Sequence, residues 1–243
     1  TFIILARYLN HESAIKAGDY ELTGNLSQIA LLDYLIKGNA KQNEIKFIEG
    51  WTFAQIRKVL NEHPAIEYKS AGLSDQQILQ HIGASETAVE GIFFFFFFYF
   101  IKGSSDLDIL QRAYKTMQNH LQNYWSERVE SLPLNTPYEA LILASIIEKE
   151  TGAESDRAEI AGVFINRLRK GMKLQTDPTV IYGLGEQFDG NLRKKDLLAD
   201  QEYNTYTRAG LPPTPISLPS LASIRAALNP AETDALYFVA KGN

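Results

Sequence analysis

LILASIIEKETG (141–152) is the stretch from which the fold of this chain can best be predicted. From residue 140 to residue 147 every residue except Ser145 is apolar, and a helix that is apolar on all sides is typical of a protein core. Thr136 stands just before it, followed by a proline and by Glu139, in the order of a T-x-x-E capping box. We therefore predict a buried helix that begins after Thr136 and carries charged residues only at its last turn.

Two glutamates occupy that last turn. Glu148 and Glu150 come just before Gly152, which is the predicted stop of the helix. The negative end of the helix dipole and removal from water both disfavour an ionised carboxylate, so such a group should have the raised pKa that a general acid needs. Residues two positions apart face nearly opposite directions, and the bulkier apolar residues one turn earlier favour Glu150. The alternative is that both are ordinary polar residues where a core helix reaches the surface.

The chain resembles the YceG-like family of endolytic murein transglycosylases. The resemblance covers most of the sequence, and the strings that carry it are LILASIIEKETG, VFINRLRKGMKLQTDPTVIYGLG (163–185) and YNTYTRAGLPPTPI (203–216). The catalytic residue of the family is the second glutamate of its E-K-E-T string, and this position corresponds to Glu150. The resemblance therefore selects the same carboxyl as the helix argument.

Two further segments supply candidate substrate contacts. Thr176-Asp177-Pro178 is predicted to form a turn, and YNTY is predicted to open a stiff, proline-rich loop whose Tyr and Asn side chains suit sugars and N-acetyl groups. Asp177 is either a second catalytic carboxylate or the first residue of an Asx turn. The predicted substrate contacts are Asn166, Gln175, Thr176, Asp177, Tyr203 and Asn204.

The resemblance implies cleavage of the β-1,4 bond between N-acetylmuramic acid and N-acetylglucosamine, with formation of a 1,6-anhydro end. We expect Glu150 to protonate the glycosidic oxygen and then to accept the proton of the muramyl C6 hydroxyl. Because that hydroxyl is tethered to the reacting sugar, no second carboxylate, metal or cofactor is needed. The alternatives are a hydrolytic muramidase that uses Glu150 and Asp177, and a non-catalytic glycan-binding scaffold.

A weak repeat marks the first part of the chain. LSQIALL (26–32) and FAQIRKV (53–59) align at an offset of 27, and each follows a strand-like run (AGDYELTG, EIKFIEG) that ends in glycine. Strand, glycine turn and helix make a small βα unit. The resemblance implies an α+β protein with a LysM-like glycan-binding subdomain at 1–64 and a mixed α+β catalytic domain at 65–243. Without the family, paired βα units are a common packing device.

Six consecutive phenylalanines, at 93–98, show neither helical nor strand periodicity. The run is too short to cross a membrane and would promote aggregation if it were exposed. At this place the YceG-like family typically reads E-G-x-x-x-Pro-Asp-Thr-Tyr and lines the cleft. Glu90 and Gly91 match, but phenylalanines 95–97 replace Pro, Asp and Thr. This departure puts a polar contribution from the loop in doubt.

Apolar periodicity and capping residues predict the remaining elements. They are helices at 2–9, 74–83, 106–128, 155–170 and 218–228 and a strand at 235–240.

The composition and the two ends of the chain limit which partners and which location can be expected. A net charge of −5 without a basic stripe argues against nucleic-acid binding, and the absence of cysteine excludes disulfides and thiolate chemistry. No signal peptide or membrane span is visible, and both ends fall in mid-pattern. The resemblance implies a fragment of a protein held in the bacterial inner membrane by a single-pass anchor, with its catalytic domain on the periplasmic side. The implied partners are peptidoglycan glycan strands and penicillin-binding synthases.

Overall fold

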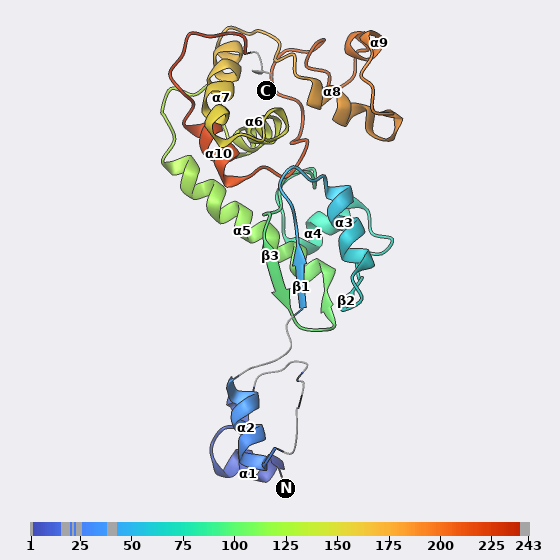
Figure 1. Cartoon of the computed structure of the whole chain (residues 1–243), viewed down its shortest axis with the longest axis vertical. Helices are drawn as coiled ribbons and strands as arrows, with labels where there is room; N and C mark the ends of the chain where they lie inside the picture. Colours follow the sequence, from blue (N-terminus) through green and yellow to red (C-terminus); the bar gives the residue numbers. More distant parts are fainter. Residues whose placement is uncertain (1, 16–19, 21, 23–25, 38–42, 239–243) are drawn as a thin grey trace.

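The computed structural model of the chain describes residues 2–15, 20, 22, 26–37 and 43–238 (Figure 1). Its helices are α1 (Phe2–Tyr8), α2 (Gln28–Lys37), α3 (Phe53–Glu62), α4 (Asp75–Ile82), α5 (Asp106–Ser126), α6 (Pro137–Glu150), α7 (Glu154–Arg169), α8 (Asp177–Leu184), α9 (Lys194–Leu198) and α10 (Leu221–Leu228). The strands are β1 (Asn43–Lys46), β2 (Ile66–Glu67), β3 (Phe97–Phe100) and β4 (Ser104–Ser105). Helices and small sheets together confirm the α+β class.

Helix α6 forms the centre of the core, as predicted. All residues from 140 to 147 are buried, including Ser145, and α6 packs against α5, α7, α8 and α10. At its start the Thr136 hydroxyl accepts a hydrogen bond from the Glu139 N–H at 3.2 Å. The Glu139 carboxylate accepts from the Asn135 N–H at 2.6 Å, one residue before the position that a capping box would use. The start of the helix is therefore confirmed, with a shifted carboxylate partner.

The end of α6 differs from the prediction. The helix ends at Glu150, and Thr151 follows in extended backbone at φ −145° and ψ 139°. Gly152 does not adopt the left-handed conformation of a glycine stop. The extended Thr151 turns the chain away from the helix axis directly after Glu150, so this carboxyl lies at the terminus itself.

The phenylalanine run contains a strand that its sequence does not reveal. β3 pairs antiparallel with β1, with Phe98 opposite Ile45 and Phe100 opposite Asn43. Phe98 and Phe100 are buried, whereas Phe97 and Tyr99 face outward. The structure therefore contains a strand that was not predicted, because the run shows no strand period in the sequence. When both faces of a strand carry aromatic residues, the alternation of inside and outside leaves no trace in the sequence.

The second of the two predicted βα units is confirmed by β1 and α3. The strand-like run of the first unit falls largely outside the described residues, and α2 follows it. The partners of β1 and α3 come from beyond residue 64, because β1 pairs with β3 and Phe53 stacks on Phe93 with ring centroids 5.2 Å apart. The LysM-like assignment and the boundary at residue 64 stay predictions.

The arrangement along the chain is visible in Figure 1. The two N-terminal helices, α1 and α2, lie together at the lower end, and α3, α4 and the small sheets occupy the middle. The long helix α5 rises from there to the upper group, which contains α6, α7, α8 and α10. Within the residues described, no helix has the length and apolar character needed to cross a membrane.

The C-terminal part differs from the predicted strand at 235–240. Residues 235–238 form no strand, and residues 239 and 240 lie outside the described part. The stretch instead runs along α7 as an irregular strip, because side chains of α7 bind its backbone carbonyls, as described below.

Candidate active site

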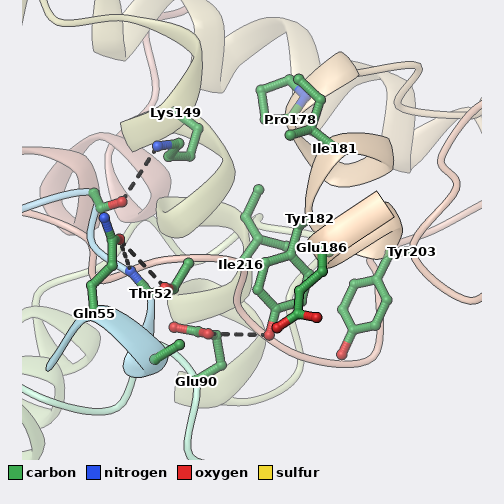
Figure 2. Close-up of a pocket in the computed structure, with 13 residues that line it drawn as sticks. Thr52, Gln55, Glu90, Lys149, Pro178, Ile181, Tyr182, Glu186, Tyr203 and Ile216 are labelled. Atoms are coloured by element: carbon green, nitrogen blue, oxygen red, sulfur yellow. Dashed lines mark hydrogen bonds between the residues drawn. The ribbon is translucent and has the colours of Figure 1, made fainter. Parts of the chain in front are cut away.

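Residues of α8 line several pockets, and two of these also receive a residue from the end of α6. The larger has a volume of about 740 Å³ and is lined by Tyr182 of α8 among others (Figure 2). The smaller has a volume of about 210 Å³ and includes Asp177, the first residue of α8. Each pocket also receives one residue from the last turn of α6, Lys149 in the larger and Glu150 in the smaller.

Glu150 lies against the segment at which we predicted substrate contacts. The Thr176 hydroxyl donates a hydrogen bond to the Glu150 carboxylate. Burial raises the pKa of the Glu150 carboxyl, the Thr176 hydroxyl lowers it, and the negative charge of Asp177 raises it. The sum of these effects is a raised pKa, the direction that a proton donor near neutral pH requires.

The loop from 203 to 206 holds this segment in place. The Thr176 N–H donates to the Thr205 hydroxyl at 3.0 Å, and the Gln175 N–H donates to the Thr205 carbonyl at 3.0 Å. The Thr179 hydroxyl donates to the Thr176 carbonyl at 2.8 Å. Gln175 has a φ of 51°, an unusual conformation for a residue other than glycine, and its exposed side chain lines the smaller pocket. The hydrogen bonds of the Gln175 N–H and of Thr176 stabilise this conformation.

Asp177 does not lie in a turn but begins α8, with Pro178 in its first turn. This corrects the turn prediction: proline is as favourable in the first turn of a helix as in a turn, so the sequence alone does not separate the two. The Tyr206 hydroxyl donates to the Asp177 carboxylate at 2.5 Å. The carboxylate is therefore oriented by a neighbouring side chain on the rim of the smaller pocket.

Tyr203 and Asn204 are not brought to the smaller pocket. Tyr203 lines the larger pocket, where its hydroxyl is 2.9 Å from that of Thr214. Asn204 is fully buried, and its amide donates to the carbonyls of Asp196, Leu197 and Ala199. In this arrangement Asn204 supports the loop and presents no polar atom to a ligand.

Asn166 is also directed elsewhere. Its side-chain amide donates to the carbonyls of Thr233 at 2.6 Å and Ala235 at 3.1 Å. Arg167 beside it donates to the Leu236 carbonyl at 2.7 Å and to the Leu174 carbonyl at 2.6 Å. The two α7 side chains therefore fasten the C-terminal strip, and only Arg167 lines the smaller pocket.

A second carboxyl with a perturbed pKa was missed as a site candidate. Glu90 is buried on the floor of the larger pocket, where it accepts hydrogen bonds from the Phe53 N–H at 2.9 Å and the Tyr182 hydroxyl at 3.1 Å (Figure 2). Burial raises the pKa of Glu90 to about 7, against the effect of both donors. The signal available in the sequence was the E-G pair itself, which precedes the phenylalanine run.

Gly91 explains part of that signal. It has a φ of +74°, and a Cβ at this position would lie 2.3 Å from the Cβ of Pro215. Only glycine allows the chain to pass this close while Glu90 turns into the pocket.

Glu148 occupies a different environment from Glu150. Its carboxylate accepts from the Ser220 N–H at 3.0 Å and the Ser223 hydroxyl at 2.7 Å, and lies 3.5 Å from the Arg157 guanidinium. Its side chain is 7% exposed, so it is more than a polar residue where the helix surfaces. The carboxylate links α6 to the starts of α7 and α10. It is saturated with partners, so Glu150 is the glutamate of this helix turn that lines the smaller pocket.

Comparisons with known proteins agree with this architecture. The family model described as the YceG-like family matches residues 1–243. The endolytic murein transglycosylase of Bacillus subtilis (strain 168) is 33% identical over 249 residues, which cover 95% of this chain and 68% of the relative. The protein of the same name from Streptococcus pneumoniae serotype 2 is 29% identical over 272 residues, which cover 98% of this chain and 49% of the relative.

A solved structure has the same fold. The crystal structure of a yceG-like protein, lmo1499, from Listeria monocytogenes aligns with a TM-score of 0.64 and 28% sequence identity, covering 99% of this chain and 84% of that one. Since the family model spans every residue of the sequence, the chain belongs to the YceG-like family.

Proposed function

We propose that the chain is a lytic transglycosylase that cleaves the β-1,4 bond between N-acetylmuramic acid and N-acetylglucosamine within peptidoglycan strands. The relatives from Bacillus subtilis and Streptococcus pneumoniae, both named endolytic murein transglycosylases, support the substrate class. The observation that carries the proposal is the position of Glu150, whose carboxyl has a raised pKa and lines a pocket beside Gln175 and Asp177.

Glu150 acts first as the general acid. Its proton passes to the glycosidic oxygen while the bond from that oxygen to the muramyl C1 breaks. Burial keeps the carboxyl protonated, and Asp177 disfavours the loss of that proton because its own negative charge is nearby.

The same carboxylate then acts as the base. It accepts the proton of the muramyl C6 hydroxyl as the C6 oxygen bonds to C1, which closes the 1,6-anhydro ring and returns Glu150 to its starting state. The Thr176 hydroxyl stabilises the carboxylate in the interval, since it donates a hydrogen bond to it. No water is consumed.

The test is digestion of purified sacculi, followed by mass spectrometry of the released fragments. We expect fragments with 1,6-anhydro ends from the active chain. Glu150→Gln should lower the rate by at least about 10²-fold, the range expected when a general acid is removed. Glu159→Gln, which removes an exposed carboxylate of α7, is the matched control and should keep the rate. Unchanged turnover by the Glu150 variant would refute the assignment.

Hydrolysis is the second candidate, and it is supported by Asp177, which lines the same pocket as Glu150. Asp177 is oriented by Tyr206 and lies close enough to Glu150 to influence its pKa. A water activated by Asp177 would produce reducing ends in place of anhydro ends. Incorporation of heavy oxygen from labelled water into the fragments would favour hydrolysis and count against the transglycosylase. Binding to sacculi with no released fragment would favour a non-catalytic scaffold.

We also propose that the protein works on the periplasmic side of the bacterial inner membrane, held by a single-pass anchor, with penicillin-binding synthases as partners. The basis is the family resemblance and the place of the substrate. Fractionation of cells that produce the full-length protein, with protease access from the outer side, tests the location.

A further inference from the structure

Lys149 places a positive charge at the larger pocket. It stands next to Glu150 in the last turn of α6, and its ammonium group is 3.3 Å from the Gly50 carbonyl oxygen (Figure 2). None of the ion pairs found among the described residues includes Lys149. An ammonium group has three donors, and the Gly50 carbonyl uses one of them. The other two are available to a ligand.

The opposite wall of the pocket is aromatic. The rings of Tyr182 and Tyr203 lie 4.9 Å apart at an angle of 64°, and both line the cavity. Their hydroxyls are occupied, Tyr182 by Glu90 and Tyr203 by Thr214, so the rings present their apolar parts to the cavity. Such a wall suits the apolar face of a sugar ring, with polar groups reserved for orientation.

The charges on the lining select the sign of the ligand group. Among the described residues that line the pocket, Lys149 is the one cation. The two carboxylates, Glu90 and Glu186, lie on the side away from it in Figure 2. A substituent near Lys149 therefore meets a positive charge that is in none of the ion pairs among the described residues. One near the tyrosines meets the Glu90 carboxyl and, in the adjoining pocket, Arg57, which lies 3.8 Å from the Asp75 carboxylate. A ligand that fits has an uncharged ring at one end and an anionic branch at the other.

We propose that the larger pocket binds a muramyl residue of the strand and that Lys149 pairs with a carboxylate on its lactyl branch, either the lactyl carboxylate itself or one of the attached peptide. This inference rests on the proposed function for its substrate class. It adds a recognition residue that makes the pocket select acidic glycan over neutral glycan. Lys149 and Glu150 are neighbours on one helix turn, so this contact would also fix which glycosidic bond meets the acid.

The test measures binding to the Glu150→Gln variant, which serves as the parent protein so that the ligands are not cleaved during the measurement. Three soluble ligands are compared by calorimetry: neutral oligomers of N-acetylglucosamine, denuded strands with free lactyl carboxylates, and strands that carry peptides. Adding Lys149→Met should weaken binding of at least one acidic ligand by roughly two- to fivefold at low salt, as expected for a partly exposed ion pair. Binding of the neutral oligomer should not change, and the acidic strand that responds identifies the carboxylate.

Two further variants make the result specific. Lys149→Arg keeps the charge and should restore most of the affinity, and Lys115→Met removes an exposed charge from α5 and should have no effect. The proposal is overturned if the Lys149→Met change leaves both acidic ligands unaffected, if it weakens the neutral oligomer equally, or if the parent binds no acidic strand. Any of these results can occur while sacculi are still cleaved to anhydro ends, so failure here is distinct from failure of the proposed function.

Discussion

Replacing Glu90 with glutamine should make the stability of the protein less dependent on pH. The side chain is buried, and its two hydrogen-bond donors, Phe53 and Tyr182, belong to different elements. Glutamine keeps the shape and can still bond to both groups, because its oxygen accepts from the Phe53 N–H and its amide donates to the Tyr182 oxygen. What the substitution removes is the cost of burying a carboxylate when it ionises.

The size of the effect follows from the pKa. In the folded protein the pKa of Glu90 is raised from 4.5 to about 7, so the folded state binds a proton between these values that the unfolded state has lost. This contribution to stability is present below pH 4.5 and is lost as the pH rises through about 7. At 1.36 kcal/mol per pH unit, the free energy of unfolding falls by roughly 2.5 kcal/mol between about pH 5 and about pH 8 because of this group.

Urea unfolding of both proteins at about pH 5 and about pH 8 measures the effect. The difference in unfolding free energy, variant minus wild type, should be about 2.5 kcal/mol larger at the higher pH. This double comparison cancels any constant change in the hydrogen bonds. Glu62→Gln, on the exposed end of α3, controls for the loss of one charge. If the variant and the wild type differ in unfolding free energy by the same amount at both pH values, the reasoning is refuted. In that case ionisation of Glu90 would not destabilise the folded protein.

Two other substitutions test the site and the fold. Thr176→Val removes the hydroxyl that stabilises ionised Glu150, so the pKa of this carboxyl should rise further. The alkaline limb of the plot of kcat/KM against pH should then move to higher pH. An alkaline limb that does not move would contradict the role of the hydroxyl. Gly91→Ala places a Cβ 2.3 Å from that of Pro215 at a φ of +74°. The free energy of unfolding measured in urea should therefore fall by roughly 2 kcal/mol or more. A fall below about 0.5 kcal/mol would show that small shifts relieve the close approach.

Much of the helical part of the fold could be predicted from the sequence. α5 and α7 have an apolar period and α6 has an uninterrupted apolar run, and each also carries caps or charges in the sense of the helix dipole. These local signals agree with the packing. β3 could not be predicted, because its partner β1 lies 51 or more residues earlier and the alternation of its faces is hidden in a uniform run. Strand pairing of this kind is decided by tertiary context.

For the site, the prediction identified the segments better than the side chains. Gln175, Thr176 and Asp177 lie beside Glu150, and their roles in catalysis and binding stay predictions. In YNTY the polar residue that was chosen, Asn204, turns inward, whereas Thr205 holds the backbone at Gln175 and Thr176. Which side chains of a loop face the site depends on the conformation of its backbone, and the residue types alone do not reveal that conformation.

The position of α8 between the two pockets has a thermodynamic consequence. Tyr182 near its end lines one cavity and Asp177 at its start lines the other. A ligand that displaces α8 from one side therefore alters the surroundings of Glu150 on the other. Where such a displacement occurs, reciprocity requires that protonation of Glu150 alters the affinity of the larger pocket by the same free energy. Ligand binding in the larger cavity and proton binding at Glu150 would then be thermodynamically coupled.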